Sequence, residues 1–136
     1  MKRTPTDIEI LDRIYDNYYD EFSSFSKDKP NRQNKTFIPI DIERIASQLN
    51  VDVDIVFGRL YYDFEKRFGY KNDDGIIVHF FASKFGNEKH CINFPFAASV
   101  LANMRDEKKK YGLSTGIAIL SLIVSVVSIC LSVLLR

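Results

Sequence analysis

The stretch from Leu113 to Leu135 limits what this chain can fold into more than any other feature. It runs for 23 residues without a charged side chain. A helix of that length extends about 34 Å, which is enough to cross a hydrocarbon core about 30 Å thick. A helix also satisfies its own backbone hydrogen bonds, as lipid requires. The stretch therefore predicts a single transmembrane helix. The alternative is the buried core helix of a soluble protein.

The charges around this stretch predict its orientation. Arg105 and the lysines at positions 108–110 precede it, whereas Arg136 alone follows it. Positively charged flanks favour the cytoplasmic side of a membrane. We therefore expect residues 1–110 to form a cytoplasmic domain and residues 111–136 to form a single-pass, C-terminal tail anchor.

The composition of the part before the anchor argues against several classes of protein. It carries 18 basic and 18 acidic residues, so no bulk charge attracts nucleic acid or anionic lipid. His79, His90 and Cys91 do not have the convergent spacing of a metal site. The chain contains no glycine-rich phosphate loop and no serine elbow. We expect neither an enzyme nor a metal or cofactor site.

Local signals predict helices along this domain. The first opens at Thr4 and Pro5, with Asp7 at capping-box spacing. Its apolar stripe follows steps of three and four and comprises Ile8, Leu11, Tyr15, Tyr18 and Phe22. After a polar loop over 23–36, residues 37–40 predict a short or edge strand, because Pro39 cannot donate to a ladder.

Two more helices are predicted close together after that strand. Asp41 caps residues 42–49, and Asp52 caps a helix that runs to about Phe68. Asn50 tolerates the left-handed conformation that ends a helix. The core side of the later helix is predicted to comprise Val53, Val56, Leu60 and Phe64.

Two strands and a fourth helix complete the predicted domain. Residues 76–85 and 90–94 are rich in β-branched and aromatic side chains, and each follows a turn signal. Pairing about the turn at 86–89 gives a hairpin that packs one face on the helices. The fourth helix follows at residues 96–110, and its apolar side comprises Ala97, Val100, Leu101 and Met104.

The segment around the second and third helices carries a spaced set of residues: Ala46-x-x-Leu49-x-Val51-Asp52-x-x-x-Val56-x-x-x-Leu60. This set resembles the helix-turn-helix of bacterial winged-helix proteins. The chain departs from that pattern at Asn50, where glycine is common, and at Phe64, one place later than the usual apolar residue. The resemblance implies a small α+β winged-helix-like domain. It would consist of three helices, a β-hairpin and a fourth helix, followed by the transmembrane helix.

Candidate contact residues lie on the third predicted helix and on the hairpin. Three of them, spaced three and four apart on the side away from the core, are Arg59, Tyr62 and Lys66. A DNA-reading helix needs such donors for base edges and phosphate. The alternative is a surface ion pair of Arg59 with Asp63. Lys84 and Lys89, beside the hairpin turn, are further candidates for nucleic-acid or partner contact.

The anchor carries small residues at a strict period of 3.5, namely Ser114, Ala118, Ser121, Ser125, Ser128 and Ser132. Small residues let membrane helices approach closely, and a 3.5 period suits a left-handed pair. The stripe therefore predicts self-association into a homodimer. The alternative is that the hydroxyls bond carbonyls of their own helix.

These observations favour a membrane-tethered regulatory or adaptor module that binds a protein partner through its winged-helix-like domain. The alternative function is a membrane-bound transcriptional regulator that contacts DNA through its third helix and its wing. Two features favour the adaptor function: the near-neutral charge of the domain, and the anchor that restricts the protein to a membrane.

Overall fold

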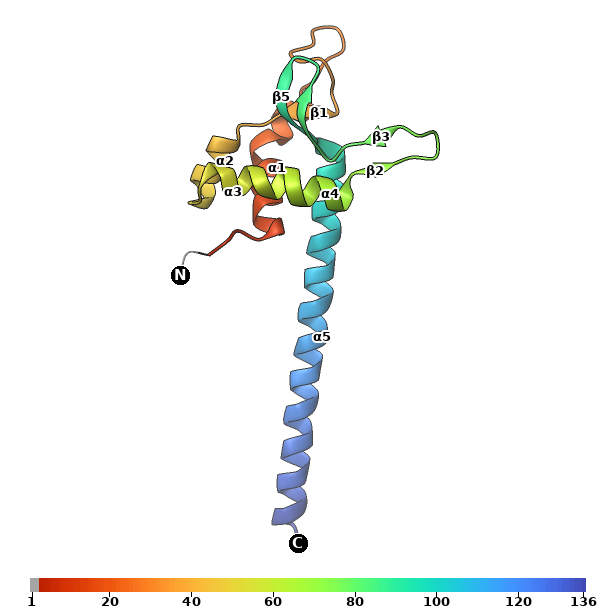
Figure 1. Ribbon diagram of the computed structural model, residues 1–136. Coiled ribbons are helices and arrows are strands. Elements are labelled where there is room, and N and C mark those ends of the chain that lie inside the picture. The colour runs from red at the N-terminus through yellow and green to blue at the C-terminus, as the bar shows by residue number, and fades with distance from the viewer. Residues whose placement is uncertain (1–2) are drawn as a thin grey trace. The chain divides into compact units, whose positions relative to one another are not determined.

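A computed structural model describes residues 3–136 (Figure 1). The chain divides into two compact units, of which the first ends at Leu101 and the second covers Ala102–Arg136. We refer to them as the N-terminal and the C-terminal unit. The N-terminal unit combines helices with small antiparallel sheets, and the C-terminal unit is helical. The predicted α+β class is therefore confirmed.

Helix α1 spans Asp7–Ser23, and its start corrects the sequence prediction. The N-cap is Thr6, not Thr4, and the capping box joins Thr6 to Glu9. The pair Thr6–Glu9 has the same spacing as Thr4–Asp7, so spacing alone could not choose between them. The buried face is also rotated from the predicted stripe and comprises Ile10, Leu11, Ile14 and Tyr18.

Helix α2, Ile42–Leu49, has the predicted bounds. The Asp41 side chain accepts a hydrogen bond from the Arg44 amide at 3.0 Å. Asn50 adopts the left-handed conformation, with φ of 54° and ψ of 46°. Both local predictions for this helix are confirmed, because they depend on residues within one turn of its ends.

The third helix is continuous over residues 53–68 but changes its winding. It comprises α3 (Val53–Gly58), a π-helical segment η1 (Arg59–Phe64) and α4 (Glu65–Phe68). The fully buried residues Val56, Leu60 and Phe64 recur every four positions. In an α-helix, a spacing of four residues rotates each successive side chain by about 40° around the helix axis. The wider turn of a π-helical segment reduces this rotation. Val53, predicted in the core, is 39% exposed.

A three-stranded sheet has the order β1-β5-β4. Strand β1 is Phe37–Pro39, β4 is Phe81–Phe85 and β5 is Glu88–Asn93. Strand β1 lies at an edge, as Pro39 predicted. Strands β4 and β5 pair in a hairpin as predicted, with Phe81 opposite Ile92. Its turn is shorter than the predicted 86–89, because β5 already begins at Glu88. At the turn between them, Gly86 has a positive φ of 59°, which glycine adopts without strain.

The prediction of one long strand over residues 76–85 is wrong, because the strand is interrupted after Val78. Strand β3 (Ile77–Val78) pairs with β2 (Tyr70–Lys71) in a separate ribbon, which projects away from the larger sheet in Figure 1. The cause is the Glu65 carboxylate of the third helix. It accepts hydrogen bonds from the backbone amides of Phe80 and Phe81, each at 2.8 Å. It therefore holds the chain at the point where the strand would otherwise continue.

The loop between α1 and β1 has a buried centre, although the sequence indicated a solvated segment. Arg32 is only 7% exposed. Its guanidinium donates to the backbone carbonyls of Glu21, Asn34 and Lys35, and it stacks over the Phe25 ring. These contacts fix the path of the loop.

Helix α5 spans Phe94–Leu134, so the predicted fourth helix and the predicted transmembrane segment are one helix. The Asn93 side chain accepts a hydrogen bond from the Phe96 amide and caps its start. Within the N-terminal unit α5 buries Phe94, Ala97, Val100 and Leu101. Its apolar part reaches a mean hydropathy of 2.8 over 18 residues, enough in length and composition to span a membrane.

Replacing Glu65 tests its role in breaking the strand. We expect Glu65→Ala to lower the free energy of unfolding by about 1–3 kcal/mol, because two amides lose their acceptor. Glu65→Gln keeps one acceptor oxygen, so its loss should be smaller. Urea unfolding of the full chain in detergent micelles, followed by near-ultraviolet circular dichroism, measures both. Equal losses for the two variants would contradict this role.

The capping box makes a prediction about acid. The Thr6 backbone amide, followed by Arg3 and the Thr6 hydroxyl, lowers the pKa of Glu9 below its ordinary value of 4.5. The folded state therefore binds the proton less readily than the unfolded state does. The stability from Glu9 is fully present above the ordinary pKa and is lost as pH falls through the lowered one.

We expect Glu9→Gln to flatten the dependence of unfolding free energy on pH between about pH 6 and pH 3. The measurement is urea unfolding of both chains across that range. Parallel curves for the variant and the unchanged protein would show that the capping box does not supply this dependence.

Candidate functional site

The exposed side of the third helix carries a strip of aromatic side chains, Phe57, Tyr61 and Tyr62. Phe57 and Tyr61 stack with ring centroids 5.4 Å apart, and Tyr61 meets Tyr62 edge-on at 5.0 Å. Tyr61 is 43% exposed and Tyr62 is 71% exposed. Ile55, nearer the helix start, is 43% exposed as well. Aromatic side chains with this exposure are typical of surfaces that bind proteins.

Arg59, the first candidate contact residue, is engaged within the N-terminal unit. It pairs with Asp7 at the start of α1 and with Asp63 at 3.2 Å. It also donates to the Pro5 carbonyl at 2.9 Å. Arg67 pairs with the same two carboxylates, each at 2.9 Å. Both guanidiniums lie over the Phe64 ring, so this network joins the third helix to α1.

The structure brings Lys66 and Lys84 to one hollow and keeps Arg59 out of it. This hollow lies between the third helix and β4, and its lining also includes Tyr61, His79 and the carboxylate-bearing Glu65. Lys84 faces Lys89 directly across β4 and β5. The two adjacent lysines make the hairpin locally basic. Because like charges in opposed positions repel, they also weaken the strand pair.

A second hollow, of about 410 Å³, is bordered by Phe57 of the aromatic strip. We call it the α2–α3 groove, and it is lined by Ile40, Asp41, Ile42, Glu43, Val53, Asp54, Phe57 and His90. Sequence reasoning missed this groove, because its residues come from three separate elements. The helical period even assigned one of its residues, Val53, to the core, whereas the structure leaves it 39% exposed.

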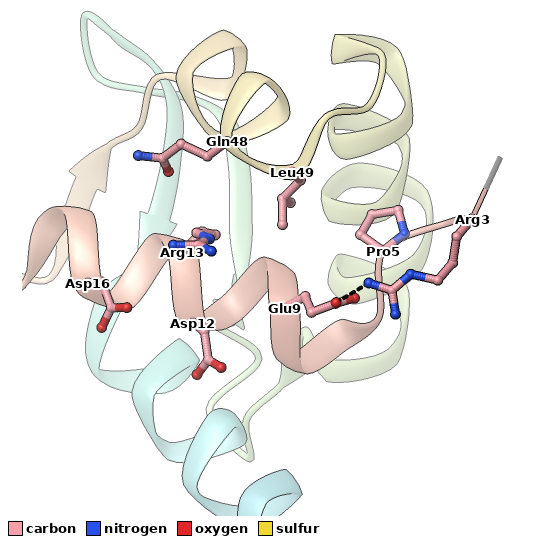
Figure 2. Close-up of a pocket in the computed structure, with 8 residues that line it drawn as sticks. All are labelled: Arg3, Pro5, Glu9, Asp12, Arg13, Asp16, Gln48 and Leu49. Carbon is pink, nitrogen blue, oxygen red and sulfur yellow. Dashed lines mark hydrogen bonds and ion pairs between the residues drawn. The ribbon is translucent and has the colours of Figure 1, made fainter.

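A third hollow, of about 330 Å³, lies between α1 and the end of α2 (Figure 2). Charged side chains of both signs line it, and Arg3 points to Glu9, with which it forms an ion pair. At the same place Asn17 and Gln48 exchange amide hydrogen bonds of 2.7 and 3.2 Å. Because these groups bind one another, the hollow indicates a contact between helices rather than a ligand site.

Within residues 3–136, no three side chains of the types His, Cys, Asp and Glu gather in a metal-binding group. The closest arrangement to a catalytic pair is Glu65 with His79, 2.6 Å apart, and this glutamate also holds the backbone described above. Cys91 is fully buried. Burial, and then the Glu88 carboxylate, raise the pKa of its thiol, which disfavours the reactive thiolate.

In the C-terminal unit, hydroxyls of the small-residue stripe bond carbonyls of their own helix. Ser121, Ser125 and Ser128 each donate to the carbonyl four residues earlier, at 2.9 Å. Ser132 donates to Ile129 at 2.7 Å. Such bonds leave the small outline of the stripe unchanged, so self-association through it stays a prediction.

No family model, curated protein or solved structure matches this chain. The candidate site therefore stands on its geometry. It is an exposed aromatic strip that borders both the α2–α3 groove and the hollow containing Lys66 and Lys84.

The network around Arg59 can be tested through Asp7. We expect Asp7→Asn to lower the free energy of unfolding by about 1 kcal/mol at low salt, and by less at high salt, because its partners are part-exposed. Asp16→Asn is the matched control on an exposed position of α1, with an expected change below about 0.5 kcal/mol. Urea unfolding at two salt concentrations measures both. Equal effects would mean that the network does not stabilise the fold.

Proposed function

We propose that this protein is a membrane-tethered adaptor or regulatory module. In this proposal the apolar part of α5 spans a membrane and the N-terminal unit lies in the cytoplasm, where the basic residues before the span favour it. The N-terminal unit binds a protein partner through the exposed side of its third helix.

The observation that carries the proposal is the division of roles on the third helix. Its two arginines, Arg59 and Arg67, are held by carboxylates, whereas Tyr61 and Tyr62 are left exposed. Lys66 is exposed and stays outside this network. A DNA-reading helix needs free donors on its outer face. A protein-binding surface instead needs large side chains that water covers poorly, and the aromatic strip supplies them.

We also propose that the N-terminal unit is winged-helix-like. Support comes from α2, the left-handed turn at Asn50 and the third helix in succession, followed by the β4–β5 hairpin. The β2–β3 ribbon between them is an addition to the predicted pattern.

A membrane-bound regulator that binds DNA is the second candidate. The hollow shared by Lys66 and Lys84, with Lys89 opposite Lys84, supports it. These three lysines could neutralise phosphates without Arg59, and such binding would weaken steeply with salt. It would position the protein on a duplex without reading base edges.

Two measurements separate these functions. The first titrates the full chain, in nanodiscs of neutral phosphatidylcholine, against labelled duplex DNA by fluorescence anisotropy at low and at physiological salt. The adaptor function predicts no saturable binding at either concentration. Binding that weakens steeply between the two would support the DNA-binding regulator and overturn the adaptor.

The second places a photo-crosslinking side chain at Tyr62 of the full chain in the cells that express it. We expect a discrete protein adduct from this position and none from Asp73, an exposed residue of the β2–β3 turn that serves as the control. Adducts of equal yield from both positions, or none from Tyr62, would contradict the proposed surface.

A further inference from the structure

We propose that the α2–α3 groove binds a segment of the partner protein in which apolar side chains alternate with lysine or arginine. This inference rests on the proposed adaptor function and adds the chemistry of the partner. It follows from the floor of the groove, its rim and the wall that His90 forms.

The floor of the groove is apolar. It consists of the buried Ile40 and Ile42, on either side of the Asp41 cap, together with the more exposed Val53 and Phe57 of α3. Val53 leaves 39% of its surface in water, although the helical period places it beside the core residues. Covering this surface would be favourable, because apolar area is removed from water. An occupant therefore needs apolar side chains.

The rim of the groove is acidic. Asp41, Glu43 and Asp54 line it, and no lysine or arginine does. Among residues 3–136, no cation forms an ion pair with Glu43 or with Asp54. Since the domain as a whole is close to neutral, the negative charge is a property of this groove. It repels nucleic acid, anionic lipid and acidic peptides, and it attracts lysine and arginine.

The wall formed by His90 is fixed. His90 has a φ of 54°, in the left-handed region that residues other than glycine rarely adopt. Its carbonyl accepts the Ile40 amide at 3.0 Å, and its ring lies edge-on to Phe57 and stacked on Phe81. These backbone and ring contacts hold this wall of the groove in place.

An apolar segment that carries basic residues is the occupant that satisfies all three features. A small cation alone would leave the floor exposed, and a purely apolar segment would leave the Glu43 and Asp54 carboxylates without a cationic partner. The volume of about 410 Å³ accommodates a few side chains of one short segment. The adjoining strip of Phe57, Tyr61 and Tyr62 extends the contact along the third helix.

The test uses the full chain in neutral phosphatidylcholine nanodiscs and three synthetic peptides of equal length. One alternates leucine with lysine, one leucine with glutamate, and one serine with lysine. We expect the leucine–lysine peptide to bind at least about tenfold more tightly than either of the others. Its binding should shift the amide resonances of Val53, Phe57 and His90 in NMR spectra.

Charge variants provide the second part of the test. We expect the double variant E43Q/D54N to weaken binding of the leucine–lysine peptide by about threefold or more, and E43K/D54K by about tenfold or more. The control D73N/D74N removes two exposed carboxylates of the β2–β3 turn and should leave affinity within about twofold. The neutral pair is isosteric, so it keeps the test valid if the lysine pair does not fold.

Equal binding of the leucine–lysine and leucine–glutamate peptides would overturn the inference, as would an unchanged affinity in E43Q/D54N. In that case a protein adduct from Tyr62 would still support the adaptor function. The absence of any such adduct, with the peptide preference intact, would instead place the fault in the adaptor function.

Discussion

The carboxylate of Glu65 is the interaction on which the arrangement of the N-terminal unit depends. It extends from the third helix and accepts the amides of Phe80 and Phe81, while its other oxygen meets His79. A continuous strand would have carried the chain past this point. Held here instead, the two phenylalanines enter the core, fully buried or nearly so, and β4 begins in pairing distance of β5. The β2–β3 ribbon is left as a separate element.

The third helix shows how one sequence serves a core and a surface at once. Its buried residues recur every four positions, and the π segment keeps them facing inward. The same helix gives both arginines to the network with Asp7 and Asp63, which ties it to α1. Tyr61, Tyr62 and Lys66 remain exposed on this helix. The two arginines thus stabilise the fold through their ion pairs, which favours the proposed protein-binding surface.

Net charge conceals the electrostatic character of this unit. Equal numbers of acids and bases cancel in the sum, yet the structure separates them. The hollow beside β4 contains Lys66 and Lys84 with one acid, Glu65, whereas the rim of the α2–α3 groove contains carboxylates alone as its charged residues. Because Coulomb interactions between exposed groups fade within about 8 Å at physiological salt, a ligand responds to the local set and not to the total. Two surfaces of opposite preference can therefore share one neutral domain.

The sequence alone determined the features that depend on close neighbours or on composition. The bounds of α2, its cap at Asp41, its left-handed end at Asn50 and the apolar length of α5 belong to this class. The tertiary structure decided the rest. Residue spacing could not decide whether Thr4 or Thr6 caps α1. A run of β-branched residues could not reveal that Glu65 would interrupt the predicted strand. Arg59 pairs with Asp7, which lies 52 positions earlier in the chain. The α2–α3 groove is lined by residues of α2, α3 and β5. Such contacts form between segments whose proximity exists only once the core has packed, so no local pattern contains them.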